Sequence, residues 1–207
     1  MPMPQLKLSY FDGPGRAEPI RVALRMAGLP FEDERLNHQQ FVEKKQEGAF
    51  PLGSVPVLEV DGVVIVQTSA ILRYVARLGQ TDLYPTDPFR ALLVDSALDT
   101  LNDTLSHALT PSLFERDLEK KLAMRAELVR GPMRLAYGYL ARLVKTSGGP
   151  FIAGAQLSIA DLVLAAQILQ IEAGKLDGIN SEHLAEYPGL IALKDAYMAD
   201  PRVQKVR

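Results

Sequence analysis

The first third of the chain alternates between short strand-like runs and segments with helical periodicity. Residues 5–10 are typical of a strand, which ends at the bend 12–15 (Asp-Gly-Pro-Gly). In the next segment, apolar residues at i, i+3, i+4 and i+7 predict a helix whose inner face is formed by Ile20, Ala23, Leu24 and Ala27. Residues 31–36 can form a second strand. The polar segment 38–48 is ambiguous and fits a short helix.

A hairpin and a helix complete this first unit. The β-branched runs 55–60 and 63–66 flank Asp61-Gly62, a dipeptide typical of a two-residue hairpin turn. The segment 68–78 follows and has one apolar helical face. The predicted order β-α-β-(α)-β-β-α describes a small α/β domain over residues 1–79.

Beyond residue 79 the pattern changes. The turn-rich segment 80–88 is interpreted as a linker, and residues 89–207 have helical periodicity without strand signals. The helices predicted there cover residues 90–109, 116–145, 159–173 and 190–199. Ser158 and Asp161 have the spacing of a capping box, and the apolar run after them predicts a buried helix. We therefore expect an all-helical second domain.

Composition narrows the function classes. The 207 residues include 23 Lys and Arg against 25 Asp and Glu, a formal charge of −2, so we predict no nucleic-acid partner and no binding to anionic membranes. Because the chain has no cysteine, disulfides and cysteine nucleophiles are excluded. His38, His107 and His183 are scattered without metal-ligand spacing, so we predict no metal site.

We expect a cytoplasmic protein without a membrane segment. No apolar signal-peptide core follows Met1. The longest apolar runs, such as 162–166, are far shorter than the roughly 18 residues that a membrane-spanning helix needs. The sequence also lacks the motifs of serine hydrolases, P-loop proteins and dinucleotide-binding folds.

Four segments carry residues suited to binding or catalysis. In the first, Tyr10 ends a strand, a glycine-rich bend follows, and Arg16 opens a helix whose N-terminus favours negative charge. The alternative interpretation is an ordinary aromatic strand end with a surface arginine. The pattern alone gives the two interpretations about equal weight.

The second and third segments could hold an extended peptide. A cis Val55–Pro56 bond would turn the Val55 amide and carbonyl outward, although a proline at the start of a strand needs no such role. Gln67-Thr68-Ser69 lies between a strand and a helix. Its hydroxyls and free amides suit a carboxylate, or simply cap the helix.

The fourth segment is a row of carboxylates, Asp95, Asp99 and Asp103, at i, i+4 and i+8. Like charges at this spacing cost about 0.2–0.5 kcal/mol per pair. The row is therefore either a solvated acidic face or a site for an ammonium or divalent ion. Together the four segments offer what a small acidic peptide with one free amine would need.

These residues resemble the cytosolic glutathione transferases, among them the tyrosine-type classes and most closely the sigma class. The similarity spans nearly the whole chain and is carried by Tyr10-Phe11-x4-Arg16-Ala17-Glu18-x-Ile20-Arg21, Ser54-Val55-Pro56-Val57-Leu58-Glu59-x-Asp61-Gly62, Gln67-Thr68-x-Ala70-Ile71-x-Arg73-Tyr74 and the Ser158-x-x-Asp161 capping box. The resemblance implies an α/β thioredoxin-like N-terminal domain, an all-α C-terminal domain, a homodimer and glutathione as co-substrate.

The resemblance also implies roles for single residues. Tyr10 would hydrogen-bond the glutathione sulfur, with Arg16 supporting the thiolate. The residues expected to hold the rest of glutathione are Val55 and Pro56 at the cysteinyl backbone, Gln67 and Thr68 at the γ-glutamyl carboxylate, Lys45 at the glycyl carboxylate, and Asp103, which would reach the γ-glutamyl amine in the partner subunit. Phe11, Pro14, Leu105 and Leu109 are expected to form an apolar wall for the electrophile.

The sequence departs from the sigma pattern at several positions. Phe41 stands where that pattern has Trp, and because the chain has no Trp, the indole contact to the glycyl end should be missing. Thr68 replaces the more usual Ser, and Ser54 replaces a longer side chain. Asn102 interrupts the acidic cluster that some sigma members use for a divalent metal, which agrees with our prediction of no metal site.

The expected chemistry follows from thiol acidity. A free thiol has a pKa of about 8.5, so only a few per cent is thiolate at neutral pH. A tyrosine hydroxyl that donates a hydrogen bond to the sulfur anion favours the charged form and lowers the thiol pKa. We therefore expect a detoxification transferase that conjugates glutathione to apolar electrophiles. The alternatives are a glutathione-dependent prostaglandin-type isomerase and a non-enzymatic carrier or structural protein of the same fold.

Overall fold

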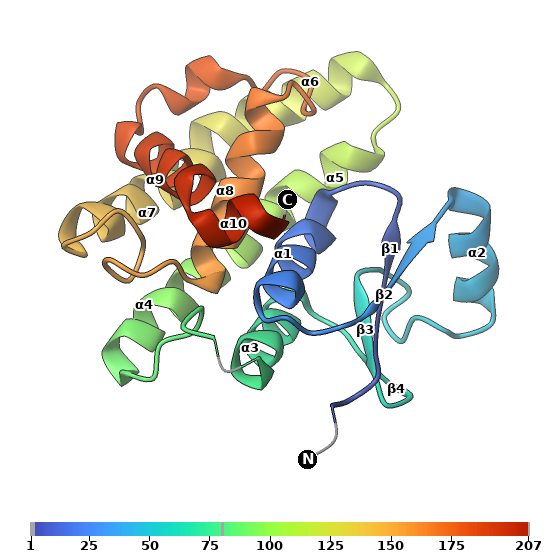
Figure 1. The fold of residues 1–207 in the computed structure, drawn as a ribbon. Helices are drawn as coiled ribbons and strands as arrows, with labels where there is room; N and C mark the ends of the chain where they lie inside the picture. Colours follow the sequence, from blue (N-terminus) through green and yellow to red (C-terminus); the bar gives the residue numbers. More distant parts are fainter. Residues whose placement is uncertain (1–2, 80, 207) are drawn as a thin grey trace. The chain divides into compact units, whose positions relative to one another are not determined.

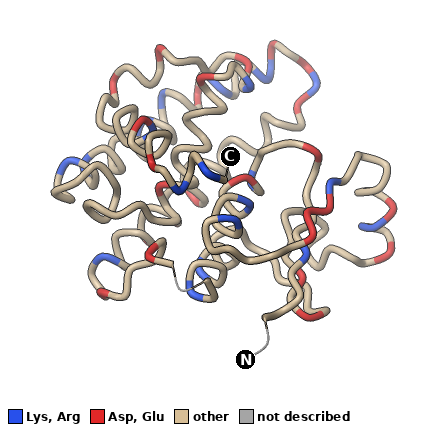
Figure 2. Tube along the Cα trace, viewed as in Figure 1, with Lys and Arg blue, Asp and Glu red and all other residues tan. Residues whose placement is uncertain are grey.

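The protein is described here by a computed structural model, which covers residues 3–79 and 81–206. The chain divides into two compact units, one of Met1–Thr81 with Lys205–Arg207 and one of Asp82–Gln204. Residue 80 of the predicted linker lies outside the described residues. Acidic and basic positions are interspersed along both units, in keeping with the small net charge (Figure 2).

The first unit is built on a four-stranded sheet with the order β2-β1-β3-β4, in which β2 runs parallel and β3 antiparallel to β1. Its elements are β1 (Leu6–Phe11), η1 (Gly15–Ala17), α1 (Glu18–Met26), β2 (Glu32–Leu36), α2 (His38–Gln46), β3 (Val57–Val60), β4 (Val63–Ile65) and α3 (Thr68–Leu78). Figure 1 shows α1 and α3 on one side of the strands and α2 on the other. The predicted thioredoxin-like α/β domain is confirmed.

The core of this unit lies between the sheet and the helices α1 and α3. Ile20 and Leu24 of α1 are fully buried, as are Leu72 and Val75 of α3 and Leu8 of the central strand β1. The predicted apolar helix faces are therefore the buried ones. Burying one such side chain contributes about 1.5–3 kcal/mol, so this small core fixes the sheet from which the site residues project.

The hairpin is also as predicted. Asp61 and Gly62 have φ angles of 48° and 85°, the left-handed conformation that both central residues of a type I′ turn require. The Asp61 side chain accepts a hydrogen bond from the backbone amide of Gln5, 2.8 Å away, which joins the turn to the start of β1. The strand β3 begins after Pro56, which has no N–H to donate to the ladder.

The rest of the chain is helical, as predicted. Its elements are α4 (Pro88–Asp99), η2 (Thr100–Ser106), α5 (His107–Phe114), α6 (Leu118–Leu128), η3 (Val129–Met133), α7 (Arg134–Thr146), α8 (Ile159–Glu172), η4 (Ser181–Leu184), α9 (Pro188–Ala199) and α10 (Pro201–Val206). The short elements η4 and α10 were not predicted. Within residues 3–79 and 81–206, no helix has the length and apolar character needed to cross a membrane.

Two predicted helices are less regular than their periodicity suggests. The segments 90–109 and 116–145 each contain a π-helical stretch, η2 and η3 respectively. Pro132 lies inside η3, and a proline cannot donate the i→i−4 hydrogen bond of an α-helix. Because η2 holds an extra residue per turn, the regular spacing predicted for the acidic row does not continue from Asp99 to Asp103.

The capping box at the start of α8 is confirmed. The carboxylate of Asp161 accepts hydrogen bonds from the backbone amide of Ser158 at 2.8 Å and from that of Ile152 at 2.9 Å. Burial raises the pKa of Asp161 to about 6, although these hydrogen bonds oppose the rise. Asp161 is completely buried, and so are Leu164 and Ile168 of the same helix, which makes α8 the buried helix that its composition predicted.

Candidate functional site

Tyr10 lies near the end of β1, and its hydroxyl is held by η1, the short helix after the next bend. The backbone amide of Arg16 donates a hydrogen bond to the Tyr10 hydroxyl oxygen at 3.1 Å. A hydroxyl has one hydrogen to donate and two lone pairs that accept. Because the amide occupies one lone pair, the hydroxyl hydrogen stays available for an acceptor outside the protein. The Arg16 side chain itself is exposed.

The backbone of η1 can approach the Tyr10 ring closely because residue 15 is a glycine. The φ angle of Gly15 is +41°, in the left-handed region that favours glycine. A β-carbon at this position would overlap the Tyr10 hydroxyl oxygen and lie 2.6 Å from Cε1 of the ring. In the sequence, Gly15 is recognisable only as part of a bend. Its role depends on the loop folding back over Tyr10, which no spacing in the sequence shows.

Arg21 of α1 forms hydrogen bonds with the bend that leads into η1. It was not predicted as a site residue. It lies on the buried face of α1, and its Nη1 donates to the carbonyl of Gly13 at 2.7 Å and, more weakly, to that of Pro14 at 3.4 Å. Its Nε pairs with Asp33 of β2 at 3.0 Å. The loop that carries the Arg16 amide is therefore tied to α1 and β2 through one side chain.

A row of aromatic rings runs from Tyr10 across this end of the unit. Phe11 contacts Tyr10 edge-on at 5.5 Å between centroids and Phe41 at 5.0 Å, and Phe41 stacks on Phe50 at 5.5 Å. Phe41 and Val55 also pack against a small buried cluster that contains Leu36, Phe50 and Val57. The structure thus brings together three predicted residues that are far apart in the sequence, namely Phe11, Phe41 and Val55.

Lys45 extends this group. Its ammonium lies 5.8 Å from the centroid of the Phe41 ring, one helical turn away in α2. A β-carbon on Gly53 would lie 3.3 Å from the same ammonium nitrogen, so the side chain reaches alongside the backbone that leads to Val55. A positive charge therefore stands beside the edge formed by residues 53–55.

The Val55–Pro56 peptide bond is cis, which is the first of the two interpretations of this segment. In the antiparallel ladder between β1 and β3, Ser9 pairs with Val57. Tyr10 is one residue beyond Ser9, and Pro56 is one residue before Val57, so the two lie at the same end of the sheet. Val55 accordingly lies near the end of the sheet at which Tyr10 is placed.

Gln67 has an unusual backbone. Its φ and ψ angles are 76° and 107°, at the position just before α3, and its side chain is exposed. Such a conformation costs a non-glycine residue about 1–3 kcal/mol and is found mostly at functional sites. Thr68 is the first residue of α3, where backbone amides lack helical partners. This pair offers hydrogen-bond donors to an anion.

The second unit contains the remaining predicted residues. Asp103 is exposed in η2, Leu109 is half-buried in α5, and Leu105 is only 5% exposed, which makes it the least accessible of the four residues predicted to line the electrophile site. Asp95 accepts a hydrogen bond from the Tyr84 hydroxyl at 2.8 Å. Among the residues that the structure describes, no group of three or more His, Asp or Glu side chains could hold a metal ion.

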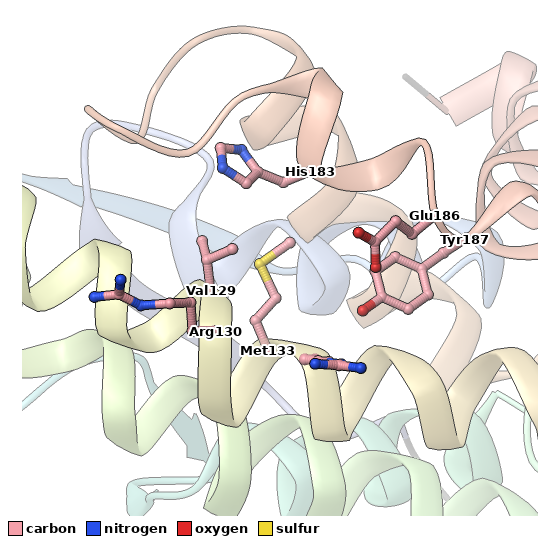
Figure 3. Close-up of a pocket in the computed structure, with 7 residues that line it drawn as sticks. Val129, Arg130, Met133, His183, Glu186 and Tyr187 are labelled. Carbon is pink, nitrogen blue, oxygen red and sulfur yellow. The ribbon is translucent and has the colours of Figure 1, made fainter.

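The second unit also contains a cavity of about 380 Å³, whose lining has both charged and apolar members: Val129, Arg130, Met133, Arg134, His183, Glu186 and Tyr187. In Figure 3, His183 lies over Val129 and Met133, with Arg130 to one side and Glu186 and Tyr187 to the other. Burial and the Glu186 carboxylate raise the pKa of Tyr187, while Arg134 opposes the rise. None of the predicted site residues lines this cavity.

Comparison with known proteins agrees with the two-unit architecture. Residues 6–77 match the family model described as glutathione S-transferase, N-terminal domain, and residues 102–206 match the glutathione S-transferase, C-terminal domain. The first match contains Tyr10, Arg16, Arg21, Val55 and Gln67, so the residues that gather in the first unit all fall within it.

Individual proteins are similar over almost their whole length. Rat glutathione S-transferase alpha-4 is 33% identical over 96% of this chain and 86% of its own. The structure of prostaglandin synthase D of Nilaparvata lugens superimposes with a TM-score of 0.83 at 28% identity, covering 98% of this chain and 96% of that one. A structure described as a monomeric glutathione S-transferase of the hookworm Necator americanus has a TM-score of 0.77 at 31% identity, with 97% and 95% covered.

Proposed function

Since this chain belongs to the glutathione S-transferase family, we propose that it activates glutathione through the Tyr10 hydroxyl and conjugates it to small apolar electrophiles. The observation that supports this mechanism is the hydrogen bond from the Arg16 amide to the Tyr10 oxygen. Because this bond uses a lone pair, the hydroxyl hydrogen can point at a sulfur anion and lower the pKa of the bound thiol. Arg16 would add a positive charge near the same anion.

We propose that glutathione lies along the edge formed by residues 53–55. Val55 would pair with the cysteinyl backbone next to cis-Pro56, and Lys45, beside Gly53, would meet the glycyl carboxylate. Gln67 and Thr68 would hold the γ-glutamyl carboxylate at the start of α3, where unpaired amides favour a negative charge. Phe41 would give the glycyl end an apolar contact only.

Several finer assignments belong to the same proposal. Phe11 and Pro14, with Leu105 and Leu109 from the helical unit, would line the electrophile site. Asp103 would reach the γ-glutamyl amine of a partner subunit in a cytoplasmic homodimer of the sigma class. The dimer needs its own test, because one relative is described as monomeric. Light scattering after size exclusion would give about twice the 22.8 kDa chain mass for a dimer.

The first experiment compares the wild-type protein with Tyr10→Phe. We expect conjugation of glutathione to a generic aryl halide to fall by about tenfold or more in the variant, and the pH at which the rate rises to move upward by about one unit or more. Equal pH profiles for the two proteins would contradict thiolate stabilisation by Tyr10. Glutathione binding, measured separately by calorimetry, shows whether the site itself is intact.

A second candidate function is glutathione-dependent isomerisation of a prostaglandin endoperoxide, favoured by the similarity to prostaglandin synthase D of Nilaparvata lugens. The chemistry would use the same thiolate, so Tyr10→Phe would affect both activities. Product analysis with an endoperoxide substrate separates the two. A protein that binds no glutathione and has neither activity would instead be a carrier or structural member of the family.

A further inference from the structure

We propose that Arg21 is a positioning residue for the reaction at Tyr10, because it holds the loop 13–15 in the conformation that brings the Arg16 amide to the Tyr10 hydroxyl. The inference rests on the proposed activation of glutathione by Tyr10. It adds a residue that does not touch the substrate and that acts through the loop and through its charge.

The contacts of Arg21 are concentrated on this loop. Its side chain is 0% exposed, and one nitrogen donates to the carbonyls of both Gly13 and Pro14. Pro14 is exposed, and the backbone hydrogen bonds of this loop include those from the Gly13 amide to the Phe11 carbonyl and from the Glu18 amide to the Pro14 carbonyl. Fixing a glycine costs more conformational entropy than fixing any other residue. The guanidinium adds to these backbone bonds its own side-chain hydrogen bonds, which fix the carbonyls of residues 13 and 14.

Carboxylates on two elements hold the guanidinium in turn. Asp33 of β2 pairs with the Arg21 Nε at 3.0 Å, and Glu18 of α1 lies 3.6 Å from its Nη1. Asp33 also pairs with Arg35 at 2.7 Å, and Arg35 reaches Asp12 at 3.4 Å. Burial would raise the pKa of Asp33, but the hydrogen bonds from Arg35 and Arg21 outweigh it and hold the pKa below its usual value. The loop is thus anchored at Asp12 through Arg35 and at residues 13–14 through Arg21.

A gain in folding stability does not explain why an arginine is buried at position 21. Removing a guanidinium from water is costly, and a buried ion pair can often be replaced by apolar side chains without loss of stability. Nη2 of Arg21 is buried and has no hydrogen-bond partner among the described residues, which adds to that cost. A positioning role at a reactive group accounts for the presence of such a side chain.

The charge of Arg21 also lies close to the reactive group. Its guanidinium carbon is 5.8 Å from the centroid of the Tyr10 ring. Asp33 and Glu18 offset part of this charge, and the remaining positive field favours negative charge that develops near the ring. Loss of Arg21 should therefore raise the pKa of the bound thiol in addition to loosening the loop.

The test uses Arg21→Met, Arg21→Lys and, as a matched control, Arg25→Met. Arg25 lies on the same helix, but its side chain is exposed and donates to the carbonyl of Val206. For each folded protein, kcat, KM for glutathione and the pH dependence of kcat/KM are measured with an aryl halide. For Arg21→Met we expect kcat about tenfold lower, the apparent thiol pKa about one unit higher, and KM changed by less than about threefold.

Arg21→Lys keeps the charge but cannot bond the Gly13 carbonyl and Asp33 in the same fork geometry. We expect Arg21→Lys to keep most of the lowering of the thiol pKa, while its kcat stays below that of the wild type. If Arg21→Met fails to fold, Arg21→Lys is the variant that tests the proposal. A folded Arg21 variant whose kcat and pH profile equal those of the wild type would overturn the proposal, whatever its melting temperature. Arg25→Met should leave kcat and the pH profile unchanged.

A double variant separates this proposal from the proposed function. If Arg21 acts through Tyr10, then Tyr10→Phe combined with Arg21→Lys should be no slower than Tyr10→Phe alone. Multiplicative losses would overturn the positioning role while leaving Tyr10 as the activating residue. If Tyr10→Phe alone leaves the pH profile unchanged, the proposed function itself fails and the Arg21 proposal fails with it.

Discussion

Gly15 and Tyr10 share a space that no larger residue at position 15 could enter. A β-carbon there would overlap the phenol oxygen and come within 2.8 Å of Cζ, while the Arg16 amide, one residue later, donates to that oxygen. The hydroxyl position therefore depends on the absence of a side chain at a residue that does no chemistry. The neighbouring Gly13 has nothing within 4 Å of its β-carbon position, so the two glycines of the bend are not equivalent.

Gly15→Ala should therefore abolish most of the activity, whereas Gly13→Ala should not. The alanine methyl would push the Tyr10 ring aside, and displacing a reactive group by about 1 Å can cost about 100-fold in rate. The measurement is kcat for conjugation of glutathione to an aryl halide, with circular dichroism to confirm folding. Equal activities of the two alanine variants would show that the space around Gly15 does not set the hydroxyl position.

Gln67 combines a strained backbone with a proposed role in binding. We expect both Gln67→Ala and Gln67→Gly to raise KM for glutathione, because both remove the side-chain amide. Only the glycine relieves the conformation at φ 76°, so it should be the more stable variant, by about 1 kcal/mol. Isothermal calorimetry and urea unfolding measure the two effects separately. If neither variant changed KM, the proposed contact with the γ-glutamyl carboxylate would be wrong.

Phe41→Trp should strengthen glutathione binding. The indole would keep the stacking on Phe50 and add an N–H donor where the phenyl ring has none. One added hydrogen bond contributes about 0.5–1.5 kcal/mol, so we expect KM to fall by roughly two- to tenfold. Phe89→Trp, at a position that is 65% exposed in α4, is the control. As the wild-type chain has no Trp, glutathione should change the fluorescence at position 41 and not at position 89.

Glu34 makes part of the stability of the first unit dependent on pH. Burial would raise the pKa of its carboxyl, but hydrogen bonds from Ser9, Lys44 and Lys7 outweigh burial and hold it at about 2, against an ordinary value of 4.5. Because the folded pKa lies below the unfolded one, this contribution is complete above about pH 4.5 and is lost as the pH falls toward 2. The difference in unfolding free energy between wild type and Glu34→Gln should shrink between pH 6 and pH 3. Urea titrations at both pH values check this, and a constant difference would contradict it.

The features that the sequence predicted depend on local patterns, whereas those that it did not predict depend on contacts between distant residues. Periodicity predicted α1 and α3 because their cores are apolar stripes, and Asp61-Gly62 predicted its turn because the dipeptide suits the required dihedral angles. Arg21 was missed because a pattern of polar and apolar positions assigns an arginine to the surface, and its burial depends on carboxylates from β2. Tyr10 and Val55 were suggested by local signals, and the resemblance gave them roles that the proposed experiments test.

The π-helical stretches η2 and η3 affect where the chain can lose a residue. A π-helical stretch holds one residue more than α-helical hydrogen bonding needs, so deleting one residue there would leave the turns on either side in phase. A deletion elsewhere in the same helices would rotate all later side chains by about 100° and turn their apolar face out of the core. A residue can therefore be lost most easily at 100–106 and 129–133.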